Sequence, residues 1–140
     1  MIYLDSSALL KLLHEEAESA ALADWLSARA GIPMVSSELA KVEVLRVCRR
    51  VNADALPEAK MLLALLDLIR LTSDVIDEAA DVGEVMLRSL DAIHLASALS
   101  IRADLSTFIA YDHRLGGAAS AAGLELLTPG REDTSRPPGI

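Results

Sequence analysis

The chain has 140 residues, of which 52% are hydrophobic and only 3% aromatic, so it suits one domain with an aliphatic core. Its net charge of −8 argues against a broad basic surface for nucleic acid, because such binding depends on lysine and arginine neutralising phosphates. Cys48 is the single cysteine, which excludes an intramolecular disulfide and a cysteine metal site. No apolar run reaches the ~18 residues of a membrane span, and the N-terminus lacks a signal-peptide pattern, so we expect a cytoplasmic protein.

Short apolar segments alternate with helical segments along the whole chain. The expected strands cover about 1–4, 32–36, 68–72, 107–111 and 124–127. The expected helices cover about 6–14, 17–30, 37–51, 57–67, 73–86, 89–99 and 112–122. Strands that are apolar on both faces and alternate with helices predict an α/β fold. We expect a three-layer α/β/α sandwich around a short, mostly parallel sheet.

Two segments are interpreted as having no catalytic role. The helix expected at 73–86 carries acids but no base, and Val75, Ala79 and Val82 recur at helical spacing, so its acids form a solvated face. Ser73 and Ser89 are suited to cap their helices, as is Ser36 or Ser37. Residues 131–140 are rich in proline and charge and predict a disordered tail after a domain at 1–130.

Four acids interrupt apolar surroundings. Asp5 follows the first expected strand, Asp112 follows the fourth, Glu43 lies between two valines, and Asp91 lies in the first turn of an apolar helix. Ligands of parallel sheets bind beyond the carboxyl ends of the strands, where the strand order reverses. Four carboxylates without cysteines are ligands that Mg²⁺ or Mn²⁺ accepts. The pattern therefore favours metal-assisted phosphoryl chemistry, if the fold gathers the four.

Each acid taken alone has a simpler explanation. Asp5 and Asp112 suit helix caps, Asp91 suits the positive end of a helix dipole, and Glu43 suits an ordinary helix surface. Taken together these explanations weaken, because Glu43 shares a helix face with Arg46 and Arg50. His94 lies one turn after Asp91 on an apolar helix, and we interpret it as a satisfied core histidine rather than a metal ligand.

Four segments resemble, in order and spacing, the signature blocks of the PIN domain, and more narrowly those of the VapC-type ribonuclease toxins of bacterial type II toxin–antitoxin pairs. They read IYLDSSALLKLL, SSELAKVEVLR, LRSLDAIHLASAL and FIAYDHRL, and the resemblance spans about residues 1–130. It implies that Asp5, Glu43, Asp91 and Asp112 are the catalytic, metal-binding acids and that Ser7 supports them. The chain departs from the family at Ala110, where threonine or serine is common, and at His113 and Arg114, where some members have a further acid.

The resemblance implies a Mg²⁺-dependent endoribonuclease, with Mn²⁺ as a possible substitute, in which metal-activated water cleaves RNA. Arg46, Arg50 and Arg114 are candidates for contacts with RNA phosphates. Two alternatives stay open. One is a catalytically degenerate PIN-like binding module. The other is a haloacid-dehalogenase-like phosphatase, which is disfavoured because Ser7 stands where such enzymes have a second aspartate.

Two kinds of protein partner are expected besides RNA. The resemblance implies a cognate VapB-like antitoxin whose arm occupies the acid site. Several helices carry more leucine and alanine than one small sheet can cover, which predicts a homodimer through apolar helix faces. No membrane partner is expected.

Overall fold

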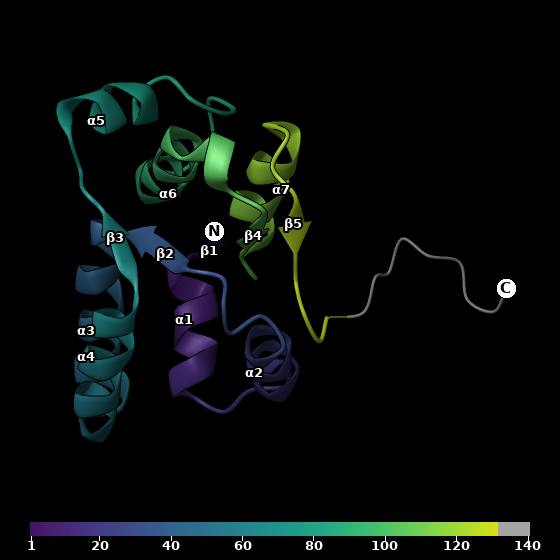
Figure 1. The fold of residues 1–140 in the computed structure, drawn as a ribbon. Coiled ribbons are helices and arrows are strands. Elements are labelled where there is room, and N and C mark those ends of the chain that lie inside the picture. Colours follow the sequence, from purple (N-terminus) through teal and green to yellow (C-terminus); the bar gives the residue numbers. More distant parts are fainter. Residues whose placement is uncertain (132–140) are drawn as a thin grey trace, which may run out of the picture.

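Five short strands form one sheet in the computed structural model, which describes residues 1–131 (Figure 1). The strands are β1 (Ile2–Leu4), β2 (Met34–Ser37), β3 (Asp67–Ile69), β4 (Thr107–Ile109) and β5 (Leu126–Leu127). Their order in the sheet is β3-β2-β1-β4-β5, and every neighbouring pair is parallel. The strand order therefore reverses at the central strand β1, which places the predicted ligand-binding edge beyond β1 and β4.

Helices cover both faces of this sheet. The first face carries α1 (Ser6–Leu13), α2 (Ser19–Ser27), α3 (Glu38–Val51) and α4 (Leu56–Leu65), and the second carries α5 (Ser73–Ala79), α6 (Ser89–Ser100) and α7 (His113–Ala121) (Figure 1). Single turns of 3₁₀ helix lie at Ala53–Ala55 and Arg102–Asp104. Side chains of β1 alternate between the two cores, with Ile2 and Leu4 in one and Tyr3 in the other. The predicted three-layer α/β/α sandwich is confirmed, and its sheet is wholly parallel.

Four of the seven helices in residues 1–131 begin at a side-chain cap, whereas α2, α4 and α6 do not. Asp5 caps α1 by accepting the Ala8 N–H, and Ser37 caps α3 by accepting the Leu39 N–H. The predicted caps of α5 and α6 are wrong by one residue. Thr72 caps α5 in place of Ser73, and Ser89 is the first helical residue of α6, which has no side-chain cap.

The acidic helix is shorter than predicted, because α5 ends at Ala79 and turns follow it. Gly83 lies in this turn segment with φ +78°, a conformation that glycine adopts readily and a helix does not allow. The apolar spacing that predicted a helix to about residue 86 therefore continues into a loop. Its acids are all exposed, as expected for a solvated surface.

The chain from 128 to 131 lies against the domain. The Tyr111 hydroxyl donates to the Pro129 carbonyl at 2.7 Å, and the Arg131 guanidinium donates to the Tyr111 carbonyl at 2.7 Å. Arg131, which the sequence placed in the tail, thus contacts the domain. The rest of the predicted tail, 132–140, is outside the described residues. Across residues 1–131, no helix has both the length and the apolar character needed to cross a bilayer.

Candidate active site at the carboxyl edge of the sheet

The four predicted acids come from four elements at one edge of the sheet. Asp5 directly follows β1, and Asp112 caps α7 three residues after the end of the neighbouring strand β4. Asp91 lies in the first turn of α6, and Glu43 lies in the second turn of α3, which contacts α6. The carboxyl ends of β1 and β4 meet where the strand order reverses, so the topology brings these elements to one place.

The side chain of Asp5 is fixed by hydrogen bonds within the protein itself. This side chain is buried at 3% exposure, and Oδ1 accepts the Ser7 O–H at 2.6 Å and the Ala8 N–H at 2.9 Å. The Ser7 oxygen in turn accepts the Tyr111 N–H at 2.9 Å, which ties the start of α1 to the segment after β4. Burial raises the pKa of Asp5 to about 6, although His94 and these hydrogen bonds oppose the increase.

Glu43 is held by two side chains that both contact Oε1. The Ser6 hydroxyl donates to Oε1 at 2.6 Å, and His94 Nε2 lies 2.7 Å from the same oxygen. Partial burial alone would raise the pKa of Glu43, but the hydrogen bonds from His94 and Ser6 outweigh it and lower the pKa below its usual value. Glu43 is therefore ionised at neutral pH. An ionised carboxylate only accepts, so Nε2 of His94 carries the donated proton.

His94 links Glu43 to the centre of the sheet. The ring is 2% exposed, and its Nδ1 lies 2.7 Å from the hydroxyl of buried Tyr3. The Tyr3 ring meets His94 edge-on at 5.9 Å and stacks on Phe108 of β4 at 5.0 Å. The prediction of a satisfied core histidine is confirmed. Sequence reasoning missed that the same residue positions Glu43, although the three-residue spacing from Asp91 places both on one face of α6.

Asp91 and Asp112 are less constrained. Asp91 is half-buried, and its pKa is raised first by burial and then by the charge of Asp112, while His94 and Arg88 oppose the increase. Asp112 is exposed, and its Oδ1 accepts the Leu115 N–H at 2.9 Å as a helix cap. The charge of Glu43 also raises the pKa of Asp91 and of Asp5. The four acids therefore form one electrostatic cluster, which we call the acid cluster.

The donor atoms of the acid cluster fit a hard divalent cation. In the hydrogen bonds of residues 1–131, Asp5, Glu43 and Asp112 each use a single carboxylate oxygen, and Asp91 uses none. Carboxylate oxygens without protein partners are suitable ligands for Mg²⁺ or Mn²⁺. Within this described part, no three acid, histidine or cysteine side chains already surround one point closely enough to hold an ion.

The three candidate arginines lie at the surface of the domain. Arg46 and Arg50 are exposed on α3, and Arg114 is exposed in the first turn of α7. Among the described residues none of the three forms an ion pair. Ala110 is buried in the apolar core of the second face, where its methyl group packs among apolar side chains.

The chain is similar to known proteins of one family. A PIN-domain family model matches residues 2–120. Two Mycobacterium tuberculosis proteins, ribonucleases VapC35 and VapC47, are 43% and 44% identical over 133 residues, covering 94% and 93% of this chain and 98% of each relative.

Solved structures give the same fold. Mycobacterium tuberculosis VapC20, described as a sarcin-ricin loop cleaving toxin, has a TM-score of 0.71 at 20% identity over 92% of this chain and 100% of that one. A toxin–antitoxin complex from Klebsiella pneumoniae has a TM-score of 0.65 at 19% identity, covering 92% of this chain and 98% of that one. With the family model matching most of its length and curated relatives above 40% identity, the chain belongs to the PIN-domain family and groups within it with the VapC proteins.

Proposed function

We propose that this protein is a metal-dependent endoribonuclease and the toxin of a VapBC-type toxin–antitoxin pair. The observation that carries the proposal is the acid cluster at the strand-order reversal, in a chain whose relatives are named ribonucleases. Burial raises the pKa values of Asp5 and Asp91 most, and neighbouring carboxylates raise them further, as is common for acids gathered at functional sites.

Asp5, Glu43, Asp91 and Asp112 are the proposed ligands of Mg²⁺ or Mn²⁺. When bound, such an ion supplies a water of lowered pKa and stabilises the negative charge that develops on a phosphate. The protein contributes the placement of the ligands. Ser7 orients Asp5, while Ser6 and His94 fix Oε1 of Glu43 and leave Oε2 for the site.

The proposed substrate is single-stranded or looped RNA, because in-line attack requires a phosphate that can be splayed into the site. Arg46, Arg50 and Arg114 are the proposed contacts to phosphates that flank the cleaved bond. These three contacts would be local rather than part of a broad basic surface. This is consistent with a net charge that disfavours broad, nonspecific binding.

The proposed protein partners are a VapB-like antitoxin and a second copy of the chain, in the cytoplasm. An antitoxin arm with a basic side chain would complement the acid cluster. A homodimer is supported by large apolar side chains that stay exposed on the first helical layer, namely Val51, Met61 and Leu65. Sedimentation of the purified protein at micromolar concentration tests the dimer, and a strict monomer would contradict it.

Cleavage of a labelled single-stranded RNA by the purified protein tests the enzymatic proposal. We expect cleavage with Mg²⁺ or Mn²⁺ and none with EDTA. RNA binding without cleavage in either metal would favour the degenerate binding module instead. Hydrolysis of a small phosphomonoester without RNA cleavage would favour the phosphatase alternative.

A further inference from the structure

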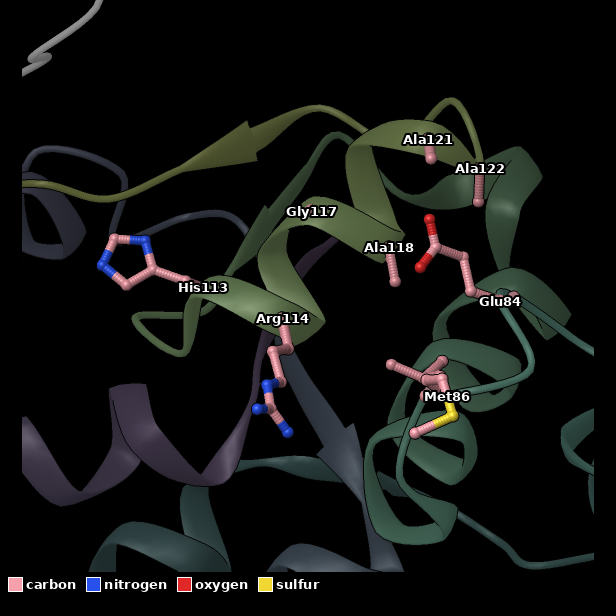
Figure 2. A pocket seen from close by; sticks show the side chains of 10 residues that line it. Glu84, Met86, His113, Arg114, Gly117, Ala118, Ala121 and Ala122 are labelled. Carbon is pink, nitrogen blue, oxygen red and sulfur yellow. The ribbon is translucent and has the colours of Figure 1, made fainter.

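A groove of about 790 Å³ begins next to Asp112 in the chain, and of its lining residues only Arg114 has a role in the function proposed so far. One wall is the turn segment 83–87, and the other is one face of α7 (Figure 2). The second wall consists of Arg114, Gly117, Ala118 and Ala121 on α7, together with His113 at the start of the helix and Ala122 just after its end. Glu84 and Met86 face this helix from the opposite wall.

Both walls lead directly to acids of the cluster. The α7 wall begins at the residue after Asp112, and the turn segment runs into α6, where Asp91 lies in the first turn. An RNA strand whose phosphate lies between Asp91 and Asp112 would therefore place a neighbouring nucleotide at the mouth of the groove.

The shape of the groove suits a flat ring. Beyond Arg114, the α7 wall is lined by glycine and alanine, so no large side chain extends from that part into the groove. A Cβ added at Gly117 would meet no atom within 4 Å. Met86 is 84% exposed and can adapt to a ligand, since methionine is flexible and its sulfur makes favourable contacts with aromatic rings. A nucleobase offers the flat face that such a slot would cover.

The charges of the groove match the order of groups in a nucleotide. Arg114 lies at the end of the groove next to Asp112, where a phosphate would need a positive partner. Glu84 lies toward the other end, and its carboxylate points toward the last turns of α7 in Figure 2. A carboxylate accepts hydrogen bonds and cannot donate them, so it suits the amino group of adenine, cytosine or guanine. Uracil has no amino group, and its one donor on the pairing edge, N3–H, is flanked by two carbonyl oxygens that repel a carboxylate.

We propose that this groove binds one nucleotide next to the cleaved phosphate of single-stranded RNA. The base lies over Gly117 and Ala118, Arg114 contacts the phosphate, and Glu84 accepts a hydrogen bond from a base amino group. The inference rests on the proposed ribonuclease function and adds a base preference to it.

Gly117→Leu tests the groove, because a Cβ at this exposed helical position meets no atom within 4 Å and a leucine built on it would extend into the groove. Leucine is also a better helix former than glycine, so the variant should fold. Ser120→Leu is the matched control, since it adds the same side chain on the same helix outside the groove. We expect KM for RNA to rise about tenfold in Gly117→Leu, the lower range for loss of one base contact, and to stay unchanged in Ser120→Leu.

Glu84→Gln tests the base preference on RNAs that differ at one position beside the cleaved bond. Wild type should prefer A, C or G over U at that position by about tenfold, and the variant should reduce this preference severalfold because glutamine both donates and accepts. Unchanged KM in Gly117→Leu together with no base preference in wild type would overturn the inference.

Binding measured by fluorescence anisotropy in an Asp91→Asn background separates this inference from the ribonuclease proposal, because it does not require cleavage. If wild type cuts no RNA but Gly117→Leu still weakens RNA binding, the ribonuclease proposal fails and the groove stands. If Gly117→Leu instead converts a dimer to a monomer with RNA affinity unchanged, the groove is an interface between two copies and the inference is wrong.

Discussion

The two pairs of acids in the candidate site are built in different ways. Asp5 and Glu43 are held by hydrogen bonds from Ser6, Ser7 and His94, which the fold provides from α1 and α6. Asp91 and Asp112 lack such support, since the only hydrogen bond of either side chain within residues 1–131 is the Asp112 helix cap. One pair is preorganised by the protein, whereas the other pair is placed mainly by where its helices begin.

This difference separates two tasks within one site. A preorganised carboxylate avoids the cost of reorganisation when charge develops nearby. A loosely held pair of like charges instead gains most when a cation arrives between them. We therefore expect Asp5 and Glu43 to define the geometry of the site, and Asp91 and Asp112 to close on a bound ion.

The largest effect is expected from removing the charge of an acid in either pair. Asp5→Asn and Asp91→Asn should each reduce the RNA cleavage rate by more than about a hundredfold. Loss of a residue that only orients a metal ligand usually reduces activity by about ten- to hundredfold, so a larger loss is expected for a ligand itself. Asparagine keeps the side-chain shape and can still cap α1 in place of Asp5. The measurement is single-turnover cleavage in saturating Mg²⁺, with Asp77→Asn on exposed α5 as the charge-matched control. An acid whose variant cuts at the wild-type rate is structural.

A smaller loss is expected when the support of the preorganised pair is removed. His94→Gln should reduce cleavage by about ten- to hundredfold and weaken Mn²⁺ binding, because Glu43 loses its fixed orientation. Tyr3→Phe keeps the contact between His94 and Glu43 and should change cleavage less, while leaving Nδ1 without its partner at a cost of about 1–3 kcal/mol of unfolding free energy. Calorimetric titration with Mn²⁺ and urea unfolding distinguish the two. Equal cleavage losses in both variants would show that His94 acts only through stability.

The buried charge of Asp5 should appear as a pH effect on metal-free stability. Its pKa is raised from 3.8 to about 6, so between these values the folded state binds more protons than the unfolded state. The contribution of this group to the unfolding free energy is therefore present at low pH and is lost as pH rises from about 4 to about 6. The loss amounts to about 3 kcal/mol.

Urea unfolding in EDTA at pH 4 and pH 7.5 measures this effect as a difference between wild type and Asp5→Asn. The other titrating groups are common to both proteins, so the variant should gain relative stability at the higher pH. Mg²⁺ should stabilise wild type more than the variant. Parallel stability curves for the two proteins would contradict the raised pKa.

The smallest effect is expected at the C-terminus, far from either acid pair in sequence. Removal of residues 132–140 should leave cleavage within about tenfold of the full chain. Removal of Arg131 as well should lower the unfolding free energy by about 1 kcal/mol, because its hydrogen bond to the Tyr111 carbonyl is lost. Cleavage rates and thermal unfolding of both truncated forms check this. A greater loss of cleavage on removing 132–140 would mean that those residues reach the substrate or the domain.

Local rules were sufficient for much of the fold. Apolar runs with capping residues located all five strands and the start of α1 and α3, because burial and capping act within a few residues. They failed where two local signals competed. The apolar spacing after Ser73 favoured a long helix, but the turn around Gly83 ends the helical pattern at Ala79. Arg131 carried no local signal of its contact with Tyr111, which is twenty residues away.

The sequence by itself determined where each acid lies within its element, because strand ends and helix starts are set by neighbouring residues. Only the tertiary structure decided which residues meet. His94 contacts Glu43 across 51 positions and Tyr3 across 91, and the groove joins a turn segment to α7. Such contacts depend on the order of strands in the sheet and on packing between layers. The preorganised half of the acid cluster is therefore a product of long-range packing rather than of any local pattern.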